Sequence, residues 1–121
     1  MGNEQEFLEL LQHIAPDPEE LLQRLRFLDW GQADNERLAR HTQRVEPITQ
    51  AFIDELYERL ADYPAPAAIL GNPATTARLK HSQADYYRRL WQGRPDQDYV
   101  LERLRIGWVH QRVGVDLKWY L

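Results

Sequence analysis

The sequence contains no cysteine among its 121 residues. This absence excludes disulfide scaffolds, catalysis by a thiolate and zinc sites built from cysteine sulfur. Any metal in this protein would have to be bound by histidine, by carboxylates or through a cofactor that brings its own ligands.

Positive charge is also scarce, because the 15 basic residues are outnumbered by 19 acidic ones and the net charge is −4. The two signs are interspersed, so no basic stripe is available to neutralise phosphates, and we expect no direct nucleic-acid partner. No apolar run approaches the roughly 18 residues that span a bilayer, and the start has no apolar signal-peptide core. We therefore expect a cytoplasmic protein without a membrane partner.

Valine and isoleucine are few, whereas leucine, alanine, glutamate, glutamine and arginine dominate. Such a composition favours helices, and no segment shows the alternation typical of a half-buried strand. The chain shows no internal repeat, and its length suits one domain at most. We predict an all-α fold.

Start and stop residues predict the helix boundaries. Asp17 precedes Pro18 and two glutamates, and Gly31 follows as the expected stop. The same logic applies to Asn72 and Gly93, which predict a helix between them. Further helices are predicted at residues 4–14, 32–43, 45–61 and 96–113.

Two local features qualify that pattern. Pro47 falls in the first turn of the predicted helix 45–61, where a proline is tolerated. The segment "DYPAPAAILGNP" (residues 62–73) is rich in proline and glycine, and we predict a turn-rich connection there.

Three predicted helices each carry one polar group on an otherwise apolar face. Taken singly, His110 reads as a hydrogen-bonded core histidine, Tyr57 as a tyrosine at the edge of the core, and Ser82 says little. Only their joint pattern suggests a site. The apolar neighbours are Ile48, Phe52, Ile53, Leu56 and Leu60 around Tyr57, Leu79 and Tyr86 beside Ser82, and Ile106, Val109 and Val113 around His110.

Other kinds of site find no support. His13 ends the predicted N-terminal helix, where it suits the negative end of the helix dipole, and His41 and His81 lie among charged or polar residues. All three are best explained as solvated surface. No two histidines stand four residues apart, as a helical metal site would require. The sequence also has no Gly-x-Ser-x-Gly elbow and no glycine-rich phosphate loop, so hydrolase and nucleotide-binding functions are not indicated.

The segment "IGWVHQRVGVDLKWY" (residues 106–120) resembles a motif of the globin-coupled sensors and protoglobins, Ile-Gly-x-x-His-x-Arg-Ile-Gly-Leu-x-x-x-Trp-Tyr. The segments around residues 78–87 and 55–64 resemble helix E and the end of helix B of that family. The resemblance covers nearly the whole chain. It implies a globin-like fold, with the chain running through helix F and the start of helix G.

In the family the motif histidine is the proximal ligand of a b-type haem, so the resemblance assigns this role to His110. It also places Tyr57 at the distal tyrosine, Leu79 at the apolar residue over the haem, and Ser82 at a small hydroxyl position. Imidazole is a common axial haem ligand, and a phenol that is protonated at neutral pH can donate a hydrogen bond to a bound gas. The expected apolar walls are Phe52, Leu56, Leu79, Ile106, Val109 and Val113.

The resemblance implies a gas sensor for O2, with CO and NO as further ligands. In the family such a domain signals to a C-terminal output module such as a diguanylate cyclase or a chemotaxis transducer, and it dimerises through helices G and H. We expect residues 1–121 to be an incomplete sensor globin domain that lacks these helices and the output module, with homodimerisation in the full-length protein. The domain itself is then not an enzyme.

Two alternatives remain. The first is a haem-free globin-like interaction module, although such a core has no reason to keep both His110 and Tyr57. The second is a small haem enzyme, a peroxidase or an NO dioxygenase, which is disfavoured because no distal histidine and arginine pair suited to O–O cleavage is evident. His81 is a less favoured candidate for a sixth ligand of the ferric iron.

Overall fold

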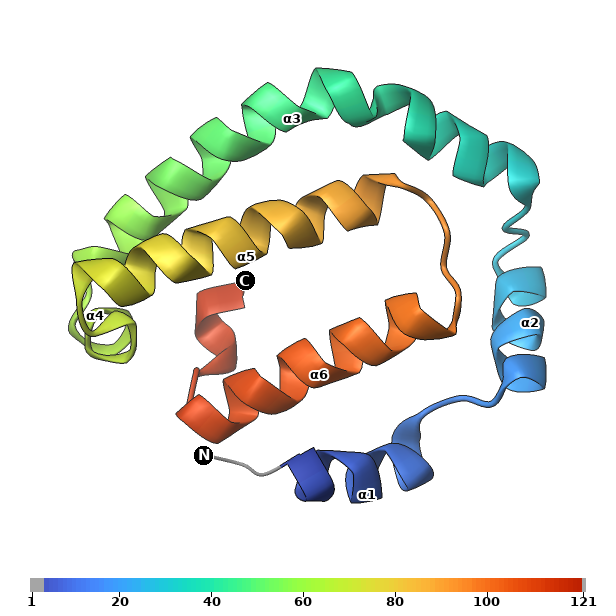
Figure 1. Cartoon of the computed structure of the whole chain (residues 1–121), viewed down its shortest axis with the longest axis horizontal. Helices are drawn as coiled ribbons and strands as arrows, with labels where there is room; N and C mark the ends of the chain where they lie inside the picture. The colour runs from blue at the N-terminus through green and yellow to red at the C-terminus, as the bar shows by residue number, and fades with distance from the viewer. Residues whose placement is uncertain (1–3, 121) are drawn as a thin grey trace. The chain divides into compact units, whose positions relative to one another are not determined.

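The structure is a computed structural model that describes residues 4–120. It contains no strand within this range, which confirms the all-α prediction. The contacts divide the chain into two compact parts, Met1–Gly31 with Arg94–Leu121 and Gln32–Gly93. The helices are α1 (Glu4–Ile14), α2 (Pro18–Phe27), α3 (Gln32–Ala61), α4 (Pro64–Leu70), α5 (Pro73–Trp91), α6 (Gln97–Val113) and the 3-10 helix η1 (Leu117–Tyr120) (Figure 1).

The N-caps predicted at Asp17 and Asn72 are present, and Asp96, which was predicted as the first residue of the last helix, is an N-cap as well. A side-chain oxygen of Asp17, Asn72 and Asp96 accepts a hydrogen bond from the backbone N–H three residues later, at 2.8, 2.9 and 2.9 Å respectively. Each bond satisfies one of the donors that the first turn of a helix leaves without an intrahelical partner. The start of α2, α5 and α6 is therefore fixed by local sequence.

The C-terminal end of α2 differs from the prediction. The helix ends at Phe27 and does not continue up to Gly31, because Asp29 adopts a left-handed conformation with φ 52° and the N–H of Trp30 donates to the carbonyl of Leu25 at 2.9 Å. Aspartate is one of the few residues other than glycine that adopt this conformation readily. The end predicted for α5 is confirmed, because Gly93 follows it with φ 71°.

Helix α3 replaces two predicted helices with one of 30 residues, and Pro47 lies in its interior. Side chains on both sides of Pro47 bind α5: Thr42 donates to the carbonyl of Trp91 at 3.3 Å, and Lys80 pairs with Asp54 at 3.3 Å. Because α3 packs antiparallel to α5 on both sides of Pro47, the helix continues through this residue, although proline removes one backbone hydrogen bond. Figure 1 shows α3 as a long curved helix with α5 beside it.

Helix α4 occupies the segment that was predicted as a turn-rich connection, so that prediction was wrong. Pro64 stands at the start of the helix, where the missing N–H costs nothing, and Gly71 ends it with φ 74°. Pro66 and Leu70 are buried. Burial of these apolar residues stabilises a seven-residue helix that local propensity alone would not.

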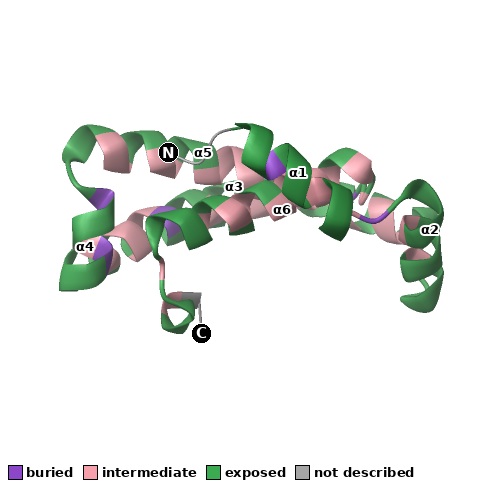
Figure 2. Cartoon of the chain, turned by 90° about the horizontal axis from the view of Figure 1, so that it is seen from below, coloured by how far each residue is buried: buried purple, intermediate pink, exposed green. Residues whose placement is uncertain are grey.

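Few side chains are fully enclosed. Phe7 and Ile53 are the largest, at 1% and 0% exposure, and Figure 2 shows most of the helical surface as exposed or intermediate. Ile53 therefore occupies the buried position on α3, whereas Ile48 of the predicted apolar stripe is 69% exposed. None of the helices within residues 4–120 is long and apolar enough to cross a membrane.

Gly93 makes a close backbone approach to α3. A Cβ at this position would lie 2.7 Å from the backbone oxygen of Asn35 and 3.0 Å from the Cβ of Leu38. We expect Gly93→Ala to lower the free energy of unfolding by about 2 kcal/mol, because it adds this overlap to the cost of a left-handed alanine. Urea denaturation measures the loss.

Gly71→Ala is the matched control for this substitution. Gly71 has nearly the same φ, 74°, but a Cβ there meets nothing within 4 Å, so this variant incurs the backbone cost alone. Equal losses in the two variants would show that the approach of Gly93 to α3 contributes nothing to stability.

Candidate functional site

His110 lies in the last turn of α6 and is half-buried. Ile106, Val109 and Val113 share its helical face, and the two valines are 44% and 50% exposed. Helix α1 contacts the opposite side of α6, since the ring centroids of Phe7 and Trp108 are 5.3 Å apart and Trp108 lies about 160° around the helix from His110. The face around the imidazole is thus apolar and is not the one that packs against α1.

The end of α6 fixes the backbone at His110. Gly114 adopts φ 79° directly after the helix, and the N–H of Val115 donates to the carbonyl of His110 at 3.0 Å. This left-handed cap reverses the chain within a few residues of the imidazole. This cap explains why the motif has its second glycine at position 114.

Partial burial lowers the pKa of His110 below its ordinary value of 6.5, because the charged imidazolium loses solvation. The ring is therefore neutral at neutral pH. A neutral imidazole has a nitrogen lone pair with which to bind a metal, whereas an imidazolium has none.

The lowered pKa of His110 makes the stability of the haem-free protein depend on pH. The unfolded chain binds a proton to this residue more readily than the folded chain does, so the free energy of unfolding falls as the pH drops through about 6.5. We expect the loss between about pH 7.5 and pH 5.5 to be smaller in His110→Gln, which has no group that titrates there. Urea denaturation at the two pH values measures the loss of stability in each protein. Identical losses in the wild type and in His110→Gln would contradict the lowered pKa of His110.

Aromatic residues of α3 and α5 form a second group, which we call the aromatic cluster: Phe52, Tyr57, Tyr86 and Tyr87. The ring centroids of Phe52 and Tyr87 are 6.0 Å apart, and those of Tyr86 and Tyr87 are 5.4 Å apart, both edge to face. Burial, and to a smaller degree the phenol of Tyr87, raises the pKa of Tyr57. Its hydroxyl is therefore a hydrogen-bond donor at neutral pH.

The remaining predicted residues on α5 differ in exposure. Leu79 is half-buried and Ser82 is exposed. His81, the less favoured ligand candidate, lies 3.5 Å from the carboxylate of Asp85. The sequence did not single out Tyr87, whose ring lies 6.0 Å from that of Phe52 and 5.4 Å from that of Tyr86.

The predicted site residues thus fall into two sets. The structure brings Phe52 and Tyr57 together with the tyrosines of α5 in the part formed by residues 32–93. The set around His110 belongs to the part formed by residues 4–31 and 94–120. The set around His110 has one imidazole among apolar residues, whereas the aromatic cluster combines three tyrosines with one phenylalanine.

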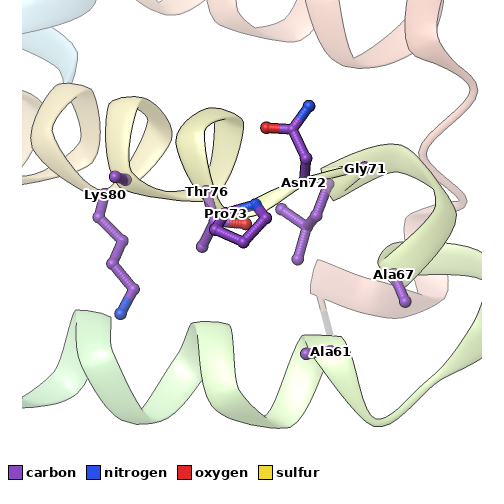
Figure 3. A pocket seen from close by; sticks show the side chains of 9 residues that line it. Ala61, Ala67, Gly71, Asn72, Pro73, Thr76 and Lys80 are labelled. Carbon is purple, nitrogen blue, oxygen red and sulfur yellow. The ribbon is translucent and has the colours of Figure 1, made fainter.

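A groove of about 490 Å³ lies where α3, α4 and the start of α5 meet. Figure 3 shows small side chains around it, with Lys80 at one end and Ala67 at the other. The Lys80 ammonium is 3.3 Å from Asp54. None of the predicted site residues lines this groove.

Metal binding by protein side chains alone is not supported. Within residues 4–120 no three histidine, aspartate or glutamate side chains are grouped in a way that could hold an ion. A metal bound through His110 would therefore need further ligands from a cofactor, and a tetrapyrrole supplies four nitrogens of its own.

Comparison with known proteins identifies the family of the chain. The chain is 29% identical over 113 residues to the heme-based aerotactic transducer HemAT of Halobacterium salinarum, an alignment that covers 93% of this chain and 23% of the transducer. The chain thus spans less than a quarter of that relative. No solved structure matches significantly. The family model for Protoglobin matches residues 17–121, which include α2 to α6, and the chain belongs to the protoglobin family.

Proposed function

We propose that this chain is a sensor globin domain that binds a b-type haem through His110 and responds to O2, with CO and NO as further ligands. The observation that carries the proposal is the half-buried imidazole of His110, whose pKa is lowered and whose helical face is apolar and partly exposed. This face belongs to the segment that matches the protoglobin family.

The residues present fit a haem. His110 would hold the haem iron through a neutral ring nitrogen, the one ligand that the protein would have to supply. Val109 and Val113 leave apolar surface uncovered next to it, at 44% and 50% exposure. A bound porphyrin would remove this surface from water, which is favourable.

When bound, haem supplies an iron centre that takes up diatomic gases reversibly. His110 would hold it on the proximal side, and the cap at Gly114 would keep the backbone of His110 in one position. Ile106, Val109 and Val113 would exclude water from that side.

On the distal side we assign the hydrogen-bond donor to Tyr57. Its raised pKa keeps the hydroxyl protonated, and Tyr87 packs against the ring of Phe52 in the same cluster. Ser82 is exposed and would act as a second donor, while Phe52 and Leu79 would form apolar walls. We do not assign His81 to the site, because its ring nitrogen lies 3.5 Å from the carboxylate of Asp85.

Signalling is proposed by analogy with the relative, which is named an aerotactic transducer. The altered hydrogen bond at Tyr57 would shift helices that pass the signal to an output module, such as a diguanylate cyclase or a chemotaxis transducer. The globin domain would itself be non-catalytic, and the full-length protein would act as a homodimer.

The proposal is tested by adding haem to the purified protein, removing the excess by gel filtration and recording absorption spectra. The spectra are taken in the ferric state, after reduction, and after exposure to O2 and to CO. A Soret band that elutes with the protein at one haem per chain and shifts with each gas is the expected result.

Failure to retain haem would instead favour a haem-free interaction module. The observation that favours such a module is the end of α2, where Phe27 is 88% and Leu28 is 64% exposed. Large apolar side chains exposed side by side are typical of a protein interaction surface.

A further inference from the structure

Gly107 is a glycine in the interior of α6 that the chain's own packing does not require. Its φ is not in the left-handed region, in contrast to Gly71, Gly93 and Gly114. It is exposed, and within residues 4–31 and 94–120 a Cβ built on it would meet no atom within 4 Å beyond the backbone of its own helix. Glycine is among the least favourable residues in a helix interior, so alanine would suit this apo structure better.

The position of Gly107 relative to His110 supplies a reason for glycine. Residues three apart in a helix are neighbours on its surface, with Cβ atoms about 5 to 6 Å apart. Side chains in a helix lean toward its N-terminus, so the imidazole of His110 is directed toward the turn that contains Ile106 and Gly107, although no atom of it lies within 4 Å of the place of a Cβ on Gly107. Whatever the ring nitrogen of His110 binds therefore lies over this turn.

From this placement we infer that Gly107 is the point at which the proximal face of the porphyrin approaches α6 most closely, and that the missing side chain makes room for it. The inference rests on the proposed haem binding through His110. It assigns Gly107 a positioning role, because it sets how near the macrocycle comes to the helix. Ile106, on the other side of the same turn, would pack against the ring.

The inference predicts effects of opposite sign on the apo protein and on the haem complex. Gly107→Ala and Gly107→Leu introduce better helix formers, so the Tm of the haem-free protein should rise by about 4 °C. In the haem complex the added side chain overlaps the porphyrin. Haem release to an excess of apomyoglobin should therefore become faster with side-chain size, by about tenfold for the leucine variant.

Gln23→Leu is the control for the effect of an added leucine, because Gln23 is exposed on α2, outside the site. This variant should release haem at the wild-type rate. Wild-type protein that retains no haem would refute the proposed function, and this inference with it.

Two results would overturn the inference while leaving haem binding intact. One is unchanged haem release in both Gly107 variants. The other is a lower apo Tm in Gly107→Ala, which would show that a protein segment and not haem approaches the glycine. A raised apo Tm together with faster haem release supports the inference, and a merely structural glycine would not produce that combination.

Discussion

His110→Ala is expected to abolish stable haem uptake. The variant loses the one bond that the protein makes to the iron, and its affinity should fall by more than about a hundredfold, because even the loss of a partner of a metal ligand costs about tenfold to a hundredfold. Alanine is the best helix former, so α6 should remain folded. The measurement is the ratio of Soret to protein absorbance after gel filtration.

The controls for this variant separate loss of the ligand from loss of structure. His81→Ala removes an exposed histidine beside Asp85 and should retain haem at the wild-type level. His110→Gly, supplemented with free imidazole, should recover a haem spectrum, because the added imidazole can occupy the space of the missing side chain. Stoichiometric haem in His110→Ala would disprove the ligand assignment.

Helix starts could be predicted from the sequence because the interactions that fix them span only three residues. The side chains of Asp17, Asn72 and Asp96 each bind an N–H in the adjacent turn. The continuation of α3 through Pro47 could not be predicted in the same way. It depends on contacts such as Thr42 with Trp91, which are 49 residues apart in the sequence.

In the candidate site, too, some features follow from local sequence and others from contacts between distant segments. The chemical character of His110 follows from its apolar helical face, which the periodicity of α6 already shows, and its lowered pKa agrees with that. The aromatic cluster depends on the register between α3 and α5, which sets Tyr87 against Phe52 at 6.0 Å. No local pattern specifies that register, so the sequence indicated Tyr57 and left its neighbour unnoticed.

Tyr57→Phe is expected to speed O2 release by about tenfold to a hundredfold with haem binding intact. Bound O2 carries partial negative charge, and a hydrogen bond to a charged group contributes about 1.5 to 3 kcal/mol. Phenylalanine keeps the ring and removes only the hydroxyl, so packing in the aromatic cluster is preserved. Stopped-flow measurement of O2 dissociation gives the rate.

The specificity of this effect rests on two comparisons. CO carries less negative charge when bound, so its release should change much less than that of O2. Tyr86→Phe removes a hydroxyl from the same cluster, at a ring that lies 5.4 Å from Tyr87, and should leave the O2 rate near the wild-type value. An unchanged O2 rate in Tyr57→Phe combined with faster release in Ser82→Ala would transfer the donor role to the serine. The exposed hydroxyl of Ser82 would then need a closed, haem-bound form to exclude water from it, because a donor that exchanges freely with water stabilises a bound ligand only weakly.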